Sequence, residues 1–179
     1  MEDIVKLAMA KWPNVPDCFG WLGLDARGNW YMRDDQAQAL GAFAGGLPAA
    51  KGSRLHHEKL IAFIQRNYGA DEQGRWFFQN GPQRVYVELE VAPWVWRVQS
   101  DFSVQAHTGE VTECLACLVD EHGWLYMDTP LGFGLVHTLD VGVAALALDD
   151  GVWEAQPVQR SDLAERYRYV LSPAQSQNC

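Results

Sequence analysis

Basic residues are scarce in this 179-residue chain, which has 14 Lys and Arg against 23 Asp and Glu and a formal net charge of −9 at pH 7. Binding to phosphate backbones relies on clustered Lys and Arg, so the composition argues against a nucleic-acid partner. The same shortage argues against an anionic membrane surface. No stretch reaches the ~20 apolar residues of a membrane helix. The start, MEDIVKLAMAKWP, lacks the long apolar run of a signal peptide, so we expect a cytoplasmic protein.

Cysteine is also scarce, at four residues, and free thiols are the simplest expectation for a cytosolic chain. Cys114 and Cys117 form a C-x-x-C motif, a spacing that metal and redox sites use. The surrounding sequence, ECLACLVDEHG, is typical of a strand that runs into a turn, and strand positions three apart point to opposite faces. A zinc site needs four ligands, and no second Cys or His pair has suitable spacing. We therefore predict no bound metal and no cofactor.

The motifs of several well-known catalytic sites are missing. The chain has no G-x-S-x-G, no H-E-x-x-H and no G-x-x-x-x-G-K-S/T phosphate loop. His137, within GLVHTLD, alternates with strand residues and is the best single candidate for a general base. It keeps open one alternative, a small hydrolase-type enzyme with a His base. A structural role is more common for such a histidine, so the sequence favours a non-enzymatic protein without catalytic residues.

What the chain does contain is one pattern written three times: DARGNWYM from Asp25, DEQGRWFF from Asp71 and DEHGWLYM from Asp120. These Asp residues are 46 and 49 residues apart. An Asp that begins a turn accepts hydrogen bonds from backbone N–H groups two residues on, and a following Gly supplies the left-handed backbone that closes the turn. We read the pattern as a duplicated β-hairpin unit, with the aromatic residues packing. The glycines predicted to have positive φ are Gly28, Gly74 and Gly123.

Hydrophobic periodicity predicts helices over residues 2–12, 55–67 and 140–148, and a last helix that runs through residue 167 or beyond. Ser53 is expected to cap the second of these helices, and Ser161 the last. Residues 33–53 are rich in Ala, Gly, Gln and Pro, and we expect a surface insertion with a short helix near residues 36–43.

These elements indicate an α+β fold of two small sheet-and-helix halves built from repeated β-hairpin units. We divide the chain into residues 1–68, residues 69–172 and a frayed tail over residues 173–179, and leave open one compact domain.

An apolar helix, an acidic turn with an aromatic pair, and a strand ending in acidic-Val-x-Pro-aromatic follow one another between RLHHEKLIAFIQRN and RVYVELEVAPWVW. This order resembles a bacterial family of unknown function with repeated β-hairpin motifs and a suggested signalling or regulatory role. The matching positions are Leu60, Ile61, Phe63, Ile64, Asp71, Gly74, Trp76, Phe77, Glu90, Val91, Pro93 and Trp94. The resemblance covers about residues 20–150, and the chain departs from it after Met32 and in its C-terminal third. It implies a regulatory role and offers no catalytic residue to carry over.

The β-rich run over residues 85–98 is the predicted border of the functional surface. Its alternation puts four aliphatic residues on one face, to be buried against the helix over residues 55–67. These four are Val85, Val87, Leu89 and Val91. The residues expected to face solvent or a cleft are Tyr86, Glu88 and Glu90. We treat this second face as too polar for a core and too aromatic for an idle surface.

The predicted ligand- or partner-binding residues are Tyr86, Glu88, Trp94, Trp96, Arg97 and His137. Trp, Tyr and Arg dominate the hot spots of recognition surfaces. We therefore expect a non-enzymatic regulatory or ligand/partner-binding module in the bacterial cytoplasm. Its partner would be an unknown protein or small molecule. Pairing of edge strands into a homodimer is left open, with Pro93 limiting one edge.

Overall fold

The computed structural model describes residues 1–176 and divides the chain into two compact units. The first unit contains residues 1–25, 29–90 and the segment from Tyr169, and the second contains residues 26–28 and 91–168. Each unit has one mixed β-sheet, of six and seven strands respectively, accompanied by helices. The predicted α+β fold in two sheet-and-helix halves is thereby confirmed. The division differs from the expected one, because residue 68 lies inside the first unit.

The sheet of the first unit has the strand order β3-β2-β1-β6-β5-β4. The strands are β1 (Cys18–Leu24), β2 (Trp30–Met32), β3 (Ser53–Arg54), β4 (Tyr68–Ala70), β5 (Trp76–Asn80) and β6 (Gln83–Leu89). Both β1-β2-β3 and β4-β5-β6 are antiparallel meanders. The two meanders join through parallel pairing of β1 with β6, where Leu22 lies opposite Val87. Strand β6 is therefore central in the sheet.

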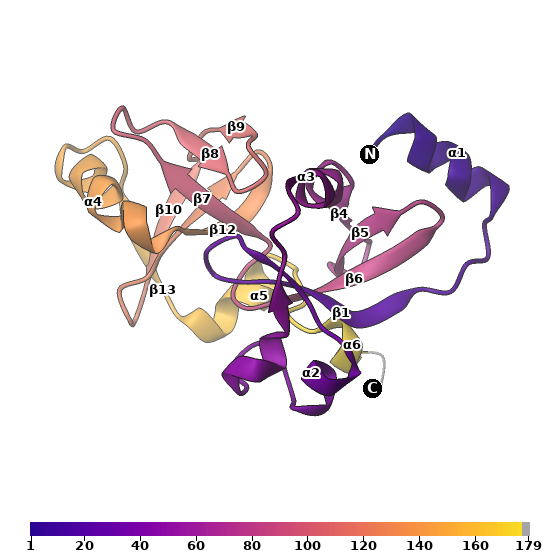
Figure 1. Ribbon diagram of the computed structural model, residues 1–179. Coiled ribbons are helices and arrows are strands. Elements are labelled where there is room, and N and C mark those ends of the chain that lie inside the picture. The colour runs from indigo at the N-terminus through magenta and orange to yellow at the C-terminus, as the bar shows by residue number, and fades with distance from the viewer. Residues whose placement is uncertain (177–179) are drawn as a thin grey trace. The chain divides into compact units, whose positions relative to one another are not determined.

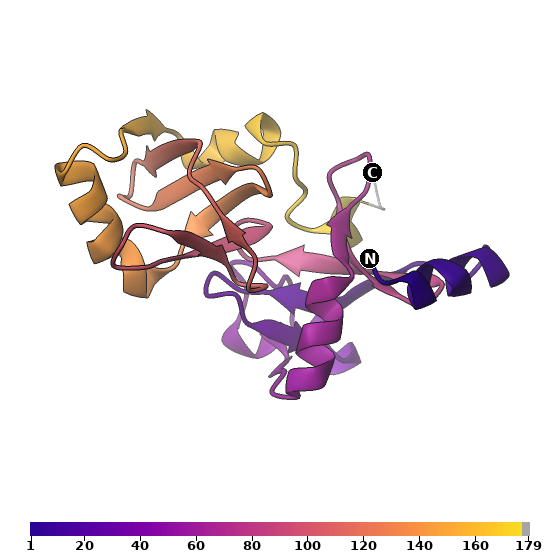
Figure 2. The same cartoon turned by 90° about the horizontal axis from the view of Figure 1, so that it is seen from above.

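Five helical segments accompany this sheet: α1 (Asp3–Lys11), α2 (Asp35–Ala39), the 3-10 turn η1 (Pro48–Lys51), α3 (Glu58–Arg66) and α6 (Pro173–Ser176). Helix α3 packs on β5, and α6 lies beside β1 and β6 (Figure 1 and Figure 2). The predicted N-terminal helix is confirmed. The predicted cap of α3 is wrong, because Ser53 pairs within β3 and His57 caps the helix by accepting a hydrogen bond from the backbone N–H of Leu60.

The segment over residues 33–53 is anchored in the first unit by a buried arginine. Arg33 is 4% exposed and donates hydrogen bonds to the carbonyl oxygens of Ala50 at 2.8 Å, Gly41 at 2.6 Å and Gly20 at 3.3 Å. Phe43, in the same segment, is 1% exposed. The expected short helix is present as α2, but the segment as a whole is more than a surface insertion, because its side chains contribute to the core.

The sheet of the second unit has the strand order β13-β10-β11-β12-β7-β8-β9. The strands are β7 (Trp94–Val98), β8 (Val104–Ala106), β9 (Val111–Thr112), β10 (Ala116–Asp120), β11 (Leu125–Thr129), β12 (Gly132–Val136) and β13 (Ala155–Val158). The helical segments are η2 (Thr138–Asp140), α4 (Val141–Asp149), η3 (Arg160–Asp162) and α5 (Leu163–Arg166). The predicted helix over residues 140–148 is confirmed as α4. Ser161 lies within η3 and caps no helix, so that prediction is wrong.

Six strands of each sheet follow one topology. In the second unit β7-β8-β9 and β10-β11-β12 are antiparallel meanders, and β7 pairs with β12 in parallel, as β1 pairs with β6 in the first unit. The second unit then adds β13 in parallel beside β10. The repeated strand order supports the duplicated hairpin unit that the sequence pattern predicts.

The predicted strand over residues 85–98 is two strands in two sheets. Strand β6 ends at Leu89 and β7 begins at Trp94, in the other unit. Both faces of β6 are buried from Tyr86 to Leu89, since Tyr86 and Val87 are 0% exposed and Glu88 is 3% exposed. The expectation that Tyr86 and Glu88 face solvent or a cleft is therefore wrong, because parallel pairing with β1 makes β6 a central strand. Val85 and Val91, which are predicted to be buried, are only half-buried.

The C-terminal segment returns to the first unit and is held there by a buried carboxylate. Glu88 accepts a hydrogen bond from the Ser172 hydroxyl at 2.5 Å and another from the Ala174 backbone N–H at 3.1 Å. The Leu89 N–H donates to the carbonyl oxygen of Leu171 at 2.8 Å. Residues 173–176 are thus helical and not frayed, whereas residues 177–179, with Cys179, lie outside the described residues. In the described part of the chain no helix has the length and apolar character to span a bilayer.

Candidate functional site

The three D-x-x-G turns share one hydrogen-bonding pattern. The N–H of each Asp donates to the carbonyl oxygen four residues on, at 3.0 Å in all three turns. One carboxylate oxygen of the Asp accepts the N–H of that same residue, at 2.8 to 3.0 Å. The glycines have φ of 80° at Gly28, 77° at Gly74 and 80° at Gly123, which confirms the prediction. The Asp and Gly of the repeat therefore build turns.

Asp71 carries a polar network on its second carboxylate oxygen. This oxygen accepts hydrogen bonds from the Tyr86 hydroxyl at 3.0 Å and from Nε of Arg75 at 2.8 Å. The Arg75 guanidinium also stacks on the Tyr86 ring, 4.7 Å from its centroid. Burial alone would raise the pKa of Asp71, but these bonds and those from the turn N–H groups lower it below its usual value.

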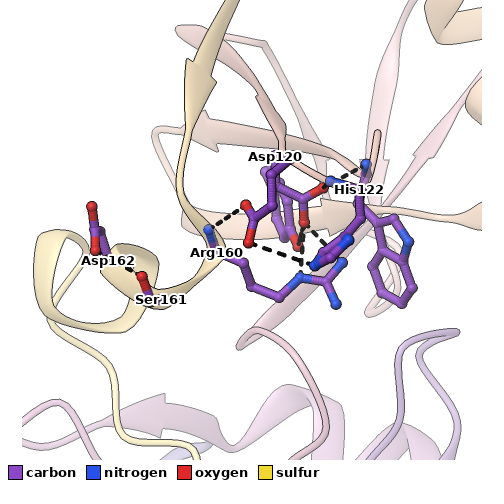
Figure 3. A network of polar contacts seen from close by, with 8 residues as sticks. Asp120, His122, Arg160, Ser161 and Asp162 are labelled. Carbon is purple, nitrogen blue, oxygen red and sulfur yellow. Dashed lines mark hydrogen bonds and ion pairs between the residues drawn. The ribbon is translucent and has the colours of Figure 1, made fainter.

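Asp120 carries the same network in the second unit. Figure 3 shows its carboxylate between the turn residue His122 and Arg160, which reaches it from the segment after β13. The second carboxylate oxygen of Asp120 accepts hydrogen bonds from the Tyr126 hydroxyl at 2.9 Å and from Nε of Arg160 at 2.8 Å. Burial would raise the pKa of Asp120, but the Trp124 N–H and these side chains together lower it. A buried ionised carboxylate beside Tyr and Arg can suggest catalysis. Its occurrence at two hairpins supports a shared role in closing the turns.

The six predicted binding residues are divided between the units. Tyr86 and Glu88 lie in β6 of the first unit, and the other four lie in the second. Five of the six are almost fully buried: Tyr86, Glu88, Trp94, Trp96 and His137. The side chain of Arg97 is 43% exposed and forms an ion pair with Asp140. No single surface gathers them within either unit, and their binding role stays a prediction.

Contacts within the second unit account for the burial of the predicted residues there. Trp94 and Trp96 stack with ring centroids 5.7 Å apart, and Nε1 of Trp96 donates to the carbonyl oxygen of Met127 at 3.1 Å. His137 caps η2, because its Nδ1 accepts the Leu139 N–H at 3.0 Å. The candidate general base thus uses one ring nitrogen for local structure.

The C-x-x-C motif does not lie on one strand. Cys117 is in β10, but Cys114 precedes it, so the prediction of two opposite faces of a strand is wrong. Both are free thiols, as predicted. Burial raises the pKa of Cys114 to about 12 and that of Cys117 to about 11. Among residues 1–176, no cluster of three or more His, Cys, Asp or Glu is placed to hold a metal ion.

The first unit contains an apolar cavity of about 270 Å³, here called the α3 pocket. Helix α3 forms one wall, and strands β1, β2, β5 and β6 supply the rest. The lining residues are Cys18, Trp21, Leu22, Met32, Leu60, Ile64, Phe78, Asn80 and Val85. None is charged, and burial raises the pKa of the Cys18 thiol. The pocket therefore offers apolar contact with a neutral thiol and one amide.

A backbone irregularity in β1 explains how two successive residues line this pocket. Side chains alternate between the faces of a regular strand, so neighbours point apart. The register of β1 with β6 shifts between Cys18 and Leu22, and Gly20 there has a φ of 82°. Such a bulge re-aims a side chain. Trp21 joins Leu22 in the lining while it stays 39% exposed, and Met32 is 45% exposed.

The sequence reasoning missed this pocket because its lining comes from five elements. The signal that was present is Gly20 next to Trp21 within an otherwise apolar strand, since an isolated Gly in a strand pattern suggests a bulge. The position of α3 over β1 and β5 could not be read from that signal.

Two sheets that share one strand order, turns closed by buried carboxylates, and an uncharged pocket beneath a helix define an α+β protein of repeated β-meanders. The chain belongs to the DUF2944 family, described as protein of unknown function (DUF2946), whose model matches residues 1–174. The resemblance to a family of unknown function is thereby confirmed. A solved structure of a DUF1285 family protein from Silicibacter pomeroyi DSS-3 is 12% identical and covers 79% of this chain and 74% of its own, with a TM-score of 0.48. A search of curated proteins gave no match.

Proposed function

We propose that the protein is a non-enzymatic, regulatory ligand-binding module of the bacterial cytoplasm, and that the α3 pocket holds a small apolar molecule. The observation that carries this proposal is the uncharged lining of the pocket beside two large apolar side chains that remain partly exposed, Trp21 and Met32. Largely apolar pockets with a few polar groups are the usual form of small-molecule sites. The volume of about 270 Å³ lies near the lower end of small-molecule pockets, about 300–1,000 Å³, which suits a small ligand better than a protein segment.

The contacts at the end of α3 support a regulatory role. Arg66 ends α3 and donates to the Glu2 carboxylate at 2.7 Å, and Asn67 accepts the Glu2 backbone N–H at 2.9 Å. Glu2 is also the residue that precedes α1. A ligand that displaces α3 would therefore also displace the start of α1. Ligand binding beneath one helix would in this way change the position of another.

The polar networks support a non-enzymatic reading. Asp71 and Asp120 have their carboxylate oxygens engaged by turn N–H groups, a tyrosine and an arginine. His137 uses Nδ1 for a helical cap. A protein partner and self-association remain predictions from the sequence.

A direct test is titration with N-phenyl-1-naphthylamine, an uncharged probe that fluoresces in apolar sites. Leu60→Glu places a charge in the pocket wall, whereas Leu40→Glu makes the same change at a residue that is 46% exposed and outside the lining. We expect Leu60→Glu to weaken probe binding at least tenfold and Leu40→Glu to leave it unchanged, with far-UV circular dichroism confirming that both fold. Trp21→Ala should also weaken binding. Equal affinity in wild type, Leu60→Glu and Trp21→Ala would rule the pocket out.

A further inference from the structure

A second cavity in the first unit lies at the end of α1 and has a different character. It measures about 290 Å³ and is here called the Gln79 pocket. Its lining residues are Met9, Trp12, Pro13, Val15, Asp17, Gln79, Pro82 and Arg84. Five of these are apolar, and one acid, one base and one amide complete the wall. None of them lines the α3 pocket.

Gln79 is the buried polar group of this cavity. It lies in β5, is 1% exposed, and its Nε2 donates to the carbonyl oxygen of Gly81 at 2.9 Å. Its Oε1 is buried and accepts no hydrogen bond within residues 1–176. Buried acceptors almost always have a donor, from protein or ordered water, so Oε1 calls for a donor that residues 1–176 do not supply. That partner must carry an N–H or O–H group.

The charged residues of the pocket have opposite signs. Arg84 is held by stacking, with its guanidinium 4.7 Å from the centroid of the Phe77 ring. Asp17 is exposed and makes no ion pair within the described part of the chain. A guanidinium recognises a carboxylate, and a carboxylate recognises an ammonium group. The pair therefore suits a molecule that carries both charges.

The remaining wall is apolar and anchored. Trp12 follows α1 directly and is 51% exposed, which is large for a Trp side chain. The connecting segment is fixed to the sheet, because Nε2 of Gln83 donates to the carbonyl oxygen of Pro16 at 3.0 Å. An aromatic ring and two prolines, Pro13 and Pro82, supply a surface for an apolar side chain.

We propose that the Gln79 pocket binds a free α-amino acid with an apolar side chain. Its ammonium group would donate to Asp17 and to Oε1 of Gln79, its carboxylate would accept from Arg84, and its side chain would pack on Trp12. This site is separate from the α3 pocket, and it gives the protein a second, zwitterionic ligand class.

Isothermal titration calorimetry with L-leucine tests this proposal. Two analogues each lack one charge: 4-methylpentanoate lacks the ammonium group and isopentylamine lacks the carboxylate. We expect L-leucine to bind at least tenfold more tightly than either analogue. Equal affinities, or no measurable binding of L-leucine, would overturn the proposal.

Matched variants locate the site. Asp17→Asn and Arg84→Gln should each weaken L-leucine binding at least tenfold. The same changes at exposed residues outside the pocket, Asp35→Asn and Arg54→Gln, should leave it unchanged. Gln79→Leu should also weaken binding, and the two charge variants decide the matter if this one folds poorly. Undiminished binding by Asp17→Asn and Arg84→Gln would overturn the proposal. Retained binding of N-phenyl-1-naphthylamine by Arg84→Gln would show that the α3 pocket is intact.

Discussion

The two sheets make the same carboxylate network from differently placed residues. In the first unit the arginine is four residues after its Asp, and the tyrosine is 15 residues away on β6. In the second unit the tyrosine is six residues away on β11, and Arg160 is 40 residues away. Trp124 occupies the position that corresponds to Arg75, and Arg160 stacks on its ring at 4.2 Å. The chemistry around the Asp is therefore kept while the sequence positions that supply it change.

The first repeat shows a third solution. Asn29 stands at the corresponding position, and its side-chain amide donates to the second oxygen of Asp25 at 2.9 Å. The residue four positions after the Asp is thus Asn, Arg or Trp in the three turns. This variation teaches that the turn itself depends on Asp and Gly, whereas the partner of the second oxygen depends on the surrounding unit.

The largest expected effect comes from the central aromatic residue of each sheet. Trp96 and Tyr86 are both 0% exposed, so Trp96→Ala and Tyr86→Ala should each destabilise their unit by about 4 kcal/mol through loss of buried area and the cavity left behind. Urea unfolding followed by circular dichroism measures this. If the units unfold in separate transitions, each variant should shift only its own. Unchanged midpoints would mean that these rings face solvent in solution.

Removing the carboxylate should be the next largest effect. Asp120→Ala leaves the Tyr126 hydroxyl and Arg160 without their partner, and we expect a loss of about 3 kcal/mol in unfolding free energy. The side chain of Asp71 is 8% exposed against 0% for Asp120, so Asp71→Ala should cost less. Asp101→Ala is the control, because that Asp is exposed and its hydrogen bonds go to the nearby Ser103, so its loss should cost under about 1 kcal/mol. If Asp101→Ala lost as much unfolding free energy as the other two variants, the networks around Asp71 and Asp120 would have no special role in stability.

Acid should weaken both networks. The folded pKa values of Asp71 and Asp120 are lowered because hydrogen bonds to the ionised forms outweigh their burial. An unfolded Asp titrates near about 3.9. The ionised side chains therefore stabilise the fold above that pH, and this stabilisation is lost as the pH falls through the lower folded values. Thermal melting between pH 6 and pH 2 should show this loss. In the double variant Asp71→Asn, Asp120→Asn, the melting temperature should fall less steeply between pH 6 and pH 2 than in the wild type. An equally steep fall would contradict the role of these two carboxylates in acid stability.

The smallest expected losses of stability come from replacing the turn glycines by alanine, and they should differ between the turns. Gly123→Ala forces a Cβ into a backbone with positive φ, at a cost of about 1 kcal/mol, but no heavy atom beyond its chain neighbours lies within 4 Å of that Cβ. A Cβ at Gly28 would lie 2.7 Å from Cβ of His107, so Gly28→Ala should cost more. Differential scanning calorimetry of Gly123→Ala and Gly28→Ala measures the two losses of stability. A smaller cost at Gly28 would show that His107 moves aside freely.

The turns could be predicted from the sequence because their determinants are local. The bonds that Asp71 accepts from the Gln73 and Arg75 N–H groups span only two and four residues, and Gly74 closes the same turn. The helices α1 and α4 follow from periodicity for the same reason. These interactions need no knowledge of the rest of the fold.

The features that the sequence predicted wrongly or did not reveal depend on contacts between residues far apart in the chain. Alternation in β6 predicted one exposed face, but pairing with β1 and contact with the C-terminal segment bury both. Glu88 is buried because its partners are Ser172 and Ala174, which are 84 and 86 residues away. The α3 pocket needs the placement of five elements, and the Gln79 pocket needs α1 beside β5. No local pattern contains that information.

The anchoring of the C-terminal segment has a consequence for how the protein is made. The ribosome delivers the chain from its N-terminus, so every residue of the second unit emerges before Ser172. The second unit can therefore complete its sheet while the first still lacks the groups that bind Glu88. During that interval the carboxylate of Glu88 lacks the two hydrogen-bond donors that Ser172 and Ala174 supply, and water must take their place. The first unit therefore gains its contacts with the Ser172 segment only after the whole second unit has been translated, although its strands are translated first.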